Sequence, residues 1–413
     1  MTEWKSAPWG KIPVTWDITT IDEASELVTD YTSNGSFKAL SDNVKYYDKP
    51  EYAWMVRYTD YSKGFVGPFV YINENAYNFL SKTKLYGDEI LISNVGIIGG
   101  VFRCPRLYSK MSLAPNSILV KFKDSDDFYF YWLKSIYGQF MMDSLTIGSV
   151  QKKLSKTNFR KMLIPVPPIS TQIRIAEILK AIDNKIYINT EINQNLEQQA
   201  AGVFYERFIT NADPSWREGT ISDLGIVVGG STPSKAKPEY YTDHGIAWIT
   251  PKDLSVDKSK FISHGADDIT ELGLRNSSAS IMPSGTVLFS SRAPIGYIAI
   301  ADGEVTTNQG FKSVVPHENV GTAFVYYFLK NALPTIENMA SGSTFKEISG
   351  SSMKNVPAIV PDNVSLKAFA DFCDSIFQEQ RTLEAENRRL STIRDTLLPK
   401  LMSGELDVSE IEL

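Results

Sequence analysis

The sequence predicts an α+β fold in which two strand-rich domains are separated by two long helices that form an antiparallel coiled coil. Three observations support this prediction: an internal repeat, two long helical stretches with the same apolar spacing, and short strand-like runs in the segments outside them. A direct repeat becomes a twofold relation in space when its two helices lie antiparallel. The fold is therefore expected to have internal pseudo-twofold symmetry.

The repeat consists of two related tracts. Residues 147–167 contain IGSVQKKLS and then IPVP, whereas residues 341–361 contain SGSTFKEIS and then AIVP. The offset is constant, because 194 residues separate Gly148 from Gly342 and the same number separates the two closing prolines. Each copy leads directly into a long amphipathic stretch. The repeated unit is thus a variable globular part followed by a helix.

Residues 1–168 are expected to form the first strand-rich domain. Short runs rich in apolar and β-branched residues, such as residues 89–93 and 117–122, alternate with turn residues. One helix is predicted at residues 127–140. The glycines within residues 96–100 lack the spacing of a dinucleotide-binding loop, so we interpret them as turn residues.

Residues 169–212 are expected to form one continuous helix. A Ser-Thr-Gln sequence after the paired prolines Pro167 and Pro168 provides a helix start, and no proline recurs before Pro214. From Ile175 onward, apolar residues recur at alternating spacings of four and three. This spacing is the pattern of a coiled-coil seam, which here includes polar positions.

The second half of the chain repeats this organisation. Residues 213–361 combine strand-like runs and turn clusters with one predicted helix at residues 323–332. Residues 362–404 are expected to form the second long helix, in which the seam of the first helix reappears in register. Residues 405–413 are interpreted as an acidic tail.

The two helices are expected to pair through seam positions that include two asparagines. These positions are Ile182, Ile186, Asn193, Leu196, Ile376, Leu383, Asn387 and Leu390. An asparagine in an apolar seam lowers stability but fixes the register of the helices. Because Asn193 and Asn387 are equivalent in the repeat, we expect them to recognise each other. The alternative is that each faces solvent on a curved helix.

Composition limits the class of protein. With 413 residues, 43% hydrophobic and 22% charged, the chain is long enough for two folded domains. Neither a targeting segment nor an apolar stretch near the ~20 residues that span a bilayer is present, so a cytoplasmic protein is expected. A net charge of −6 argues against a protein that coats nucleic acid by bulk charge. Any contact with DNA must therefore be local.

Cysteine and histidine usage predicts no metal site. Cys104 and Cys373 lie far apart in sequence, so both are expected to be reduced and structural. The three histidines, His244, His264 and His317, lack the spacing of zinc ligands. The chain also lacks a GxxxxGK[ST] phosphate loop, a GxSxG elbow and an HExxH motif. Catalysis is therefore not expected.

Polar, aromatic and basic residues instead occur in loops of both domains. Arginine and lysine suit guanine, asparagine and glutamine suit adenine, and serine and threonine suit either a base or a phosphate. The candidate DNA-binding residues are Lys38, Arg57, Asn94, Arg103, Lys235, Lys237, Thr250, Lys252, Ser291, Arg292, Asn308, Gln309 and Lys312. Alternatively, Asn308 and Gln309 cap a buried turn and Arg292 forms a structural salt bridge.

Several tracts together resemble the specificity (S) subunit of Type I restriction-modification systems. They are PVPPISTQIRIAEIL at residues 165–179, IDNKI at 182–186, GSTPS at 230–234, SRAPIG at 291–296, TNQGFK at 307–312 and LLPKLMSGEL at 397–406. The resemblance implies two target-recognition domains, each of which reads one half of a bipartite site in double-stranded DNA. The helices would then set the spacer between the half-sites.

The same resemblance implies partners. Two methyltransferase (modification) subunits would dock on the chain, endonuclease-translocase subunits would join for cleavage, and no membrane would be involved. S-adenosylmethionine, ATP and magnesium would be bound by those partners and not by this chain.

Other classes of protein stay open. A scaffold that holds proteins with two binding heads is compatible with the acidic net charge. The fused methyltransferase of a related restriction class would be an enzyme, but the missing cofactor motifs argue against it. The specificity component of a related restriction class is a further alternative.

Overall fold

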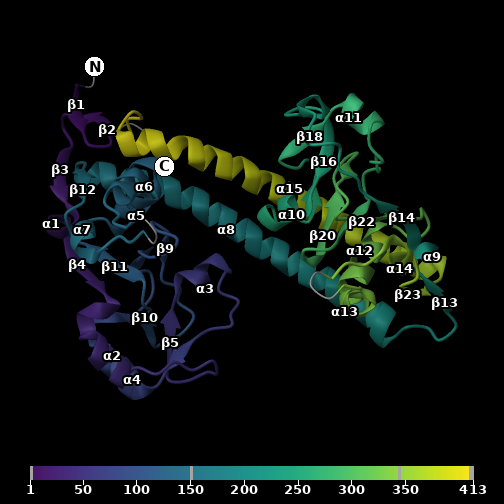
Figure 1. Ribbon diagram of the computed structural model, residues 1–413, viewed down its shortest axis with the longest axis horizontal. Coiled ribbons are helices and arrows are strands. Elements are labelled where there is room, and N and C mark those ends of the chain that lie inside the picture. The colour runs from purple at the N-terminus through teal and green to yellow at the C-terminus, as the bar shows by residue number, and fades with distance from the viewer. Residues whose placement is uncertain (1–2, 149–151, 343–345, 409–413) are drawn as a thin grey trace. The chain divides into compact units, whose positions relative to one another are not determined.

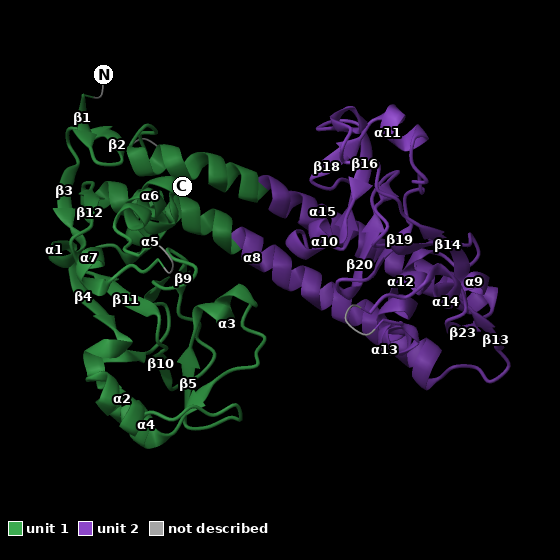
Figure 2. Cartoon of the chain, in the orientation of Figure 1, with its two compact units in different colours: residues 1–184, 390–413 green, residues 185–389 purple. Residues whose placement is uncertain are grey.

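The computed structural model describes residues 3–148, 152–342 and 346–408 (Figure 1). The chain divides into two compact units, coloured separately in Figure 2. Unit 1 comprises Met1–Asn184 and Leu390–Leu413, and unit 2 comprises Lys185–Arg389. Each unit therefore contains one end of each long helix. The division into consecutive domains at residues 168, 212, 361 and 404 stays a prediction.

Parts of the repeat and of the acidic tail lie outside the described residues. They are residues 149–151, residues 343–345 and residues 409–413.

Unit 1 is rich in short strands. Its strands are β1 (Trp4–Ala7), β2 (Gly10–Pro13), β3 (Asp17–Thr20), β4 (Ser25–Asp30), β5 (Ala53–Val56), β6 (Tyr71–Ile72), β7 (Lys84–Leu85), β8 (Ile90–Ser93), β9 (Val101–Arg103), β10 (Met111–Leu113), β11 (Ser117–Phe122) and β12 (Leu163–Val166). Its short helices are α1 (Ile21–Ala24), α2 (Phe37–Asn43), α3 (Tyr58–Ser62), α4 (Glu74–Phe79), α5 (Asp126–Lys134), α6 (Ile136–Ser144) and α7 (Lys156–Arg160).

Unit 2 has the same mixture of elements. Its strands are β13 (Arg217–Thr220), β14 (Gly225–Gly229), β15 (Tyr241–Thr242), β16 (Ile246–Ile249), β17 (Phe261–Ile262), β18 (Asp267–Ile269), β19 (Val287–Ser291), β20 (Ile295–Ala301), β21 (Thr306–Thr307), β22 (Lys312–Pro316) and β23 (Pro357–Val360). Its short helices are α9 (Ile221–Leu224), α10 (Pro251–Val256), α11 (Glu271–Arg275), α12 (Thr322–Asn331), α13 (Leu333–Met339) and α14 (Gly350–Lys354). The long helices are α8 (Ile169–Tyr205) and α15 (Asn363–Ser403).

The two units share a sheet topology. In unit 1, one sheet has the strand order β4-β11-β8-β9, and in unit 2 the sheet β14-β22-β19-β20-β17 repeats its pattern. The runs predicted as strands at residues 89–93 and 117–122 are confirmed as β8 and β11, which pair antiparallel. A two-stranded ribbon also recurs, since β12 pairs with β3 and β23 pairs with β13.

The single helix predicted at residues 127–140 is wrong, because α5 and α6 are separate. Ser135 between them is extended, with ψ of 161°, and its hydroxyl accepts a hydrogen bond from the Gly138 amide to start α6. In unit 2, the predicted helix at residues 323–332 is confirmed as α12. A further helix, α13, follows it and has a proline in its first turn, where the missing amide hydrogen is tolerated.

A strand followed by a capped helix recurs at Arg57 and Thr250. Arg57 follows β5 and precedes α3, and its backbone amide donates to the Asp60 carboxylate at 2.9 Å. Thr250 follows β16 and precedes α10, and its amide donates to the Asp253 carboxylate at 2.7 Å. The two residues therefore occupy equivalent positions in their units.

Helices α8 and α15 lie antiparallel within each unit. In unit 2, Lys185 pairs with Glu386 at 3.3 Å, and further along α8 the carbonyl of Asn193 accepts from Gln380 at 3.2 Å. In unit 1, Asp183 pairs with Arg394 at 2.9 Å. The coiled coil predicted from the alternating spacing is thus present. Of the predicted seam residues, Ile376 and Leu383 are buried, and Ile182, Ile186, Leu196 and Leu390 are half-buried.

The predicted contact between Asn193 and Asn387 is wrong. The side-chain amide of Asn387 is paired with that of Asn189, whose Nδ2 atom donates to Asn387 Oδ1 at 2.9 Å. Along an antiparallel pair, one residue number rises while the other falls, so only one pair of repeat-equivalent positions can be directly opposed. Asn193 and Asn387 are not at that point. The side-chain oxygen of Asn193 is buried with no hydrogen-bond partner among the described residues.

Both cysteines, Cys104 and Cys373, are buried free thiols. Burial raises the pKa of Cys373 to about 12, so its thiol stays protonated at neutral pH. Within the described ranges, no cluster of three or more His, Cys, Asp and Glu side chains is placed to hold a metal ion. None of the helices in those ranges has the length and apolar character needed to cross a bilayer.

Candidate nucleic-acid interface

The loops that carry most candidate residues of unit 2 converge at one end of its main sheet. The Ser231 amide donates to the Thr307 carbonyl at 2.8 Å, and the Ser291 amide donates to the Gly310 carbonyl at 2.7 Å. The hydroxyl of Thr232 also donates to Gln309. The tracts GSTPS, SRAPIG and TNQGFK, which are far apart in sequence, are therefore neighbours in the fold.

Unit 1 has a corresponding corner at the end of β8. The Asn94 amide donates to the Asn116 carbonyl at 3.0 Å, as the Ser291 amide does to Gly310. The Asn94 carbonyl accepts from the Leu154 amide at 3.0 Å, and the Ser291 carbonyl accepts from the Ile348 amide at 3.1 Å. Asn94 and Ser291 are therefore structural equivalents. Sequence comparison missed this equivalence because the loops around the two residues differ in sequence.

Two cationic side chains of the unit 2 corner lie near the same acidic residue, Glu347. Arg292 pairs with Glu347 at 3.4 Å, and Lys312 lies 3.7 Å from the same carboxylate. The Arg292 side chain is half-exposed. Glu347 lies 194 residues after Lys153 and is its equivalent in the repeat. Glu347 pairs through the backbone with Ser341, the first residue of the second repeat tract, and Lys153 pairs in the same way with Ile147, the first residue of the first tract. The repeat offset was the signal that could have identified this position.

Asn308 and Gln309 differ in accessibility. The side-chain oxygen of Asn308 accepts from the Gly310 amide at 2.8 Å and so closes a local turn, as the alternative interpretation expected. Gln309 is exposed at the surface. Ser291 is fully buried, and its hydroxyl donates to the Gly310 carbonyl at 3.1 Å. Asn308 and Ser291 therefore support the corner, and Gln309 extends from it.

The remaining candidates of unit 2 lie in other loops. Lys235 and Lys252 are exposed, and Lys237 donates to the Tyr240 hydroxyl at 3.0 Å. That hydrogen bond raises the pKa of Lys237, so its ammonium group stays charged. The Thr250 hydroxyl donates to Asp253 at 2.7 Å within the capping box of α10. The three lysines are accessible to phosphate, whereas Thr250 has a structural partner.

In unit 1, two of the candidate arginines are held by acidic groups. Arg57 pairs with the buried Asp60 at 2.6 Å and donates to the Pro68 carbonyl at 2.9 Å. Arg103 pairs with Asp127, and its guanidinium lies 4.7 Å from the ring centroid of Phe130. Both arginines therefore have structural partners.

The other two candidates of unit 1 differ in accessibility. Lys38 is exposed at the start of α2. Asn94 is 5% exposed, and its side-chain oxygen has no hydrogen-bond partner among the described residues.

Comparison with known proteins identifies a family that matches both halves of the chain. The chain matches the family described as "Type I restriction modification DNA specificity domain" over residues 13–198 and again over residues 214–390. The two matched regions correspond to the two halves of the internal repeat.

Individual relatives align over parts of their length. The Type I restriction enzyme MjaIX specificity subunit of Methanocaldococcus jannaschii is 42% identical over 160 residues, which cover 38% of this chain and 37% of that subunit. The Type I restriction enzyme HindI specificity subunit of Haemophilus influenzae is 25% identical over 317 residues, which cover 58% of this chain and 68% of that subunit. The first alignment thus spans little more than a third of its relative.

A solved structure has the same fold. The crystal structure of the Type-I restriction-modification system S subunit from M. genitalium aligns with a TM-score of 0.55 and 18% identity, and covers 94% of this chain and 96% of that chain. Because the family matches both halves of the repeat, this chain belongs to the Type I restriction-modification DNA specificity family.

Proposed function

We propose that this chain is the sequence-specific DNA-recognition subunit of a Type I restriction-modification complex. Each unit reads one half of a bipartite site in double-stranded DNA. The observation that carries this proposal is the pair of equivalent corners, at Asn94 and at Ser291, where loops distant in sequence converge. Equivalent frameworks with different loop residues are what a protein needs to read two different half-sites.

The exposed cations are expected to have two different roles in DNA binding. We expect Lys38, Lys235 and Lys252 to contact phosphates, because single lysines on loops provide charge without base selectivity. We expect the half-exposed Arg292 to read a base, since a guanidinium can donate two hydrogen bonds to guanine. Glu347 holds that guanidinium in place before DNA arrives.

The Arg292 assignment can be tested with the complex reconstituted from this chain and its methyltransferase subunits. A gel shift is expected to favour one split sequence, and Arg292→Ala is expected to relax readout at one position by about 1–3 kcal/mol. Uniform weakening across all sequences would indicate a phosphate contact instead. Equal binding of the unchanged protein to all duplexes would contradict the proposed function.

Glu347→Ala provides a matched comparison. It is expected to reduce discrimination at the same base position as Arg292→Ala, because it removes the partner of the guanidinium. The control is Glu271→Ala, which removes the partner of Arg275 in another exposed pair of the same unit, at 3.9 Å. The Arg292 pair is half-exposed and the Arg275 pair is exposed, so each contributes at most about 1 kcal/mol of stability. Differences in DNA binding will therefore not reflect unfolding.

We also propose that the long helices set the spacer, since α8 and α15 each extend from one unit into the other. Seven residues inserted after Asn184 in α8 and after Arg389 in α15 keep the seam on one face. The insertion adds about 10 Å at ~1.5 Å per residue, or roughly three base pairs at ~3.4 Å each. The spacer is expected to lengthen by that amount with both half-sites unchanged. A changed half-site would mean that the helices take part in reading bases.

Two methyltransferase subunits are proposed to dock on the helices. The apolar residues Tyr187, Ile188 and Ile192 of α8 are exposed within unit 2 and offer such a surface. Endonuclease-translocase subunits are proposed to join that complex for cleavage. We propose that S-adenosylmethionine, ATP and magnesium bind those partners and that this chain is not itself catalytic. Transfer of labelled methyl groups to DNA by the isolated chain would contradict the last point.

A protein scaffold with two binding heads is the second candidate. Its support is the net charge of −6 together with the ion pairs that already occupy Arg57, Arg103 and Arg292. The gel shift separates the two functions, because a scaffold would confer no preference for any duplex.

A further inference from the structure

The corners of the two units have matching turns. Val95 directly follows Asn94 in unit 1, as Arg292 directly follows Ser291 in unit 2. The residue after Val95 has a φ of 79° and the residue after Arg292 has a φ of 51°, so both turns continue with the same left-handed backbone. Val95 and Arg292 therefore occupy the same place in the two units.

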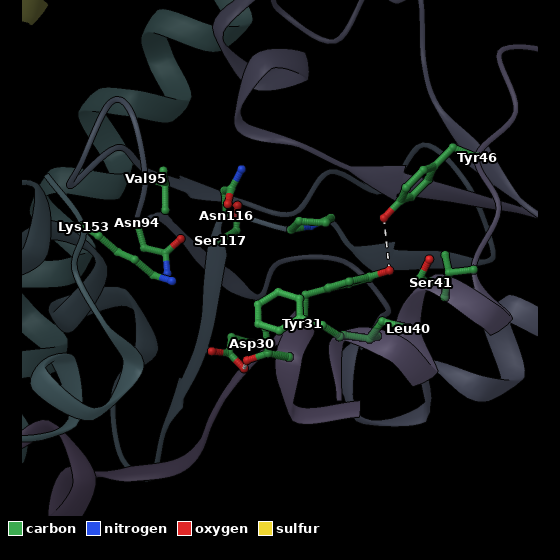
Figure 3. Close-up of a pocket in the computed structure, with 14 residues that line it drawn as sticks. Asp30, Tyr31, Leu40, Ser41, Tyr46, Asn94, Val95, Asn116, Ser117 and Lys153 are labelled. Atoms are coloured by element: carbon green, nitrogen blue, oxygen red, sulfur yellow. Dashed lines mark hydrogen bonds between the residues drawn. The ribbon is translucent and has the colours of Figure 1, made fainter. Parts of the chain in front are cut away.

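Each of these two residues is paired with a residue of the repeat tract. Val95 pairs antiparallel with Lys153, and Arg292 pairs in the same way with Glu347. Directly paired residues of antiparallel strands have their side chains on the same face. In unit 2 the Arg292 guanidinium accordingly lies 3.4 Å from the Glu347 carboxylate. In unit 1, Figure 3 shows Val95 and Lys153 together on one side of a pocket of about 400 Å³ beside Asn94.

The backbones of Lys153 and Glu347 are held in the same way on their other side. The Lys153 amide donates to the Ile147 carbonyl at 2.9 Å, and the Ile147 amide donates to the Lys153 carbonyl at 3.0 Å. Glu347 exchanges the same two hydrogen bonds with Ser341, at 2.9 Å and 3.0 Å. The side chains of Lys153 and Glu347 therefore extend from equivalent positions of two equivalent frames.

The charges at this position are opposite. Glu347 has a half-exposed carboxylate, whereas Lys153 has an exposed ammonium group. Among the described residues, no carboxylate lies within ion-pair distance of Lys153, and the adjacent Lys152 pairs with Asp143 at 3.0 Å. The corner of unit 1 thus offers hydrogen-bond donors at the position where the corner of unit 2 offers acceptors.

We propose that Lys153 and Glu347 read the corresponding base pair of the two half-sites in opposite orientations. This proposal rests on the proposed function. The Glu347 carboxylate accepts from the N4 amino group of a cytosine, and the adjacent Arg292 donates to the guanine paired with that cytosine. In the other half-site, Lys153 donates to O6 and N7 of a guanine that takes the place of the cytosine. The major groove admits a two-stranded ribbon, so it can accommodate either pair of strands.

Each of the two side chains also excludes the base that the other accepts. A carboxylate has no donor for O6 and N7 of guanine, and an ammonium group has no acceptor for the amino group of cytosine. Unfavourable contacts with the wrong base add to specificity. Exchange of the lysine for glutamate is therefore expected to change the preferred base. Loss of a phosphate contact would instead weaken binding to all sequences alike.

The test uses the reconstituted complex and duplexes in which each base pair of the recognition sequence is replaced in turn. Arg292→Ala identifies the half-site of unit 2, so the other half-site belongs to unit 1. Lys153→Glu is expected to weaken binding to the original sequence by at least about fivefold. At one position of the unit 1 half-site, it should prefer cytosine where the unchanged complex prefers guanine. Equal weakening across all duplexes, with no change in the preferred base, would overturn the proposal.

Lys152→Glu is the matched control for Lys153→Glu. It makes the same change of charge one residue away, but the Lys152 side chain pairs with Asp143. It is expected to weaken binding to all duplexes by a similar and smaller factor, with guanine still preferred. Both lysines are exposed, so neither variant should lower the melting temperature. If Lys152→Glu also changed the preferred base to cytosine, the charge of the tract would set the preference and the proposal would fail.

A second variant transfers the unit 2 pair to unit 1. Val95→Arg combined with Lys153→Glu reproduces, in the frame of unit 1, the arginine and glutamate of unit 2. At the responding position, it is expected to prefer the base pair that Arg292→Ala ceases to read in the other half-site. Val95 is half-buried, so the melting temperature is measured first, and Lys153→Glu alone decides if the double variant does not fold.

The outcomes separate this inference from the function on which it rests. Guanine preference retained by a folded double variant would overturn the inference, even in a complex that reads both half-sites. An unchanged complex without sequence preference would contradict the proposed function itself.

Discussion

Asn189 donates its side-chain amide to Asn387 Oδ1 across the helix pair at 2.9 Å, and the same amide group donates to Glu386 at 2.8 Å. Asn189 is fully buried in the seam, so its amide has been removed from water. Such a pair lowers stability relative to leucine but holds the two helices in one register.

A double-mutant cycle measures this pair. Asn189→Leu or Asn387→Leu alone is expected to lower the free energy of unfolding of unit 2 by about 1 kcal/mol, because the hydrogen bond between the two side-chain amides is lost. The double variant is expected to be at least as stable as the original protein. Urea unfolding followed by circular dichroism gives the values, and additive effects would contradict a direct interaction.

Asn193→Leu is the matched control in the same helix. Its side-chain oxygen is buried without a partner among the described residues. Replacement by leucine is therefore expected to raise stability, in contrast to either single change in the Asn189 pair.

Lys260 joins the globular part of unit 2 to both long helices. Its ammonium group pairs with Glu197 of α8 and donates to Gln380 of α15 at 2.7 Å and to the Tyr327 hydroxyl at 3.1 Å. Lys260→Ala removes a buried ammonium group and leaves the half-buried Glu197 with Lys330 as its remaining cation, and is expected to destabilise unit 2 by about 3 kcal/mol.

Lys258→Ala is the control for Lys260→Ala. Lys258 is exposed and lies two residues away, so its replacement should change thermal stability by less than about 0.5 kcal/mol. Equal effects of the two variants in a thermal melt would show that the buried contacts of Lys260 contribute nothing.

The Glu197 carboxylate makes unit 2 sensitive to acid. Burial alone would raise the pKa of Glu197, but the ammonium groups of Lys260 and Lys330 together lower it below 4.5. A carboxylate with a lowered pKa in the folded state contributes stability above pH 4.5, and that contribution is lost as the pH falls through the folded pKa. Glu197→Gln is therefore expected to flatten the loss of stability below pH 4.5.

Burial raises the pKa of the neighbouring Glu384, so its effect on the pH dependence of stability is opposite in sign to that of Glu197. The difference between the original protein and Glu197→Gln isolates the contribution of Glu197, because Glu384 is present in both. Glu191→Gln, an exposed change on α8, should leave the acid profile unchanged. A profile for Glu197→Gln that matches the original would contradict the charge pairing.

Leu401 is expected to be essential for the stability of unit 1, although it is almost the last residue of α15. It is fully buried in a cluster with Trp9, Ile12 and Trp16 near the start of the chain. Leu401→Ala is expected to destabilise unit 1 by about 3 kcal/mol, the usual effect of a buried leucine deletion. Limited proteolysis should then cleave within the first 168 residues, whereas Leu406→Ala, at an exposed position, should not have this effect.

The long helices could be predicted from sequence because their periodicity is local. The alternating spacing and the helix starts are properties of neighbouring residues, and β8 and β11 were recognisable for the same reason. The break at Ser135 was missed because its side chain can either continue a helix or cap a new one. The partner of Asn387 was also missed, since the crossing point of an antiparallel pair is set by tertiary packing.

The candidate site was less predictable. The sequence indicated which loops are polar, but it did not reveal that Glu347 pairs with Arg292, because the two residues are distant in the chain. The pocket beside Asn94 depends on where α2 lies against the turn before β11. No local pattern encodes that placement.

The composition of unit 1 has a consequence for how the protein is made. Its two segments, Met1–Asn184 and Leu390–Leu413, lie on either side of unit 2 in the chain, so one is synthesised before unit 2 and the other after it. Unit 2 is continuous in sequence, so all of its residues are synthesised before Leu401 and Met402, which complete the core of unit 1. Nascent chains usually fold from the N-terminus onward. Here the segment before unit 2 has to wait until the segment after unit 2 has been synthesised, and until then its core stays incomplete.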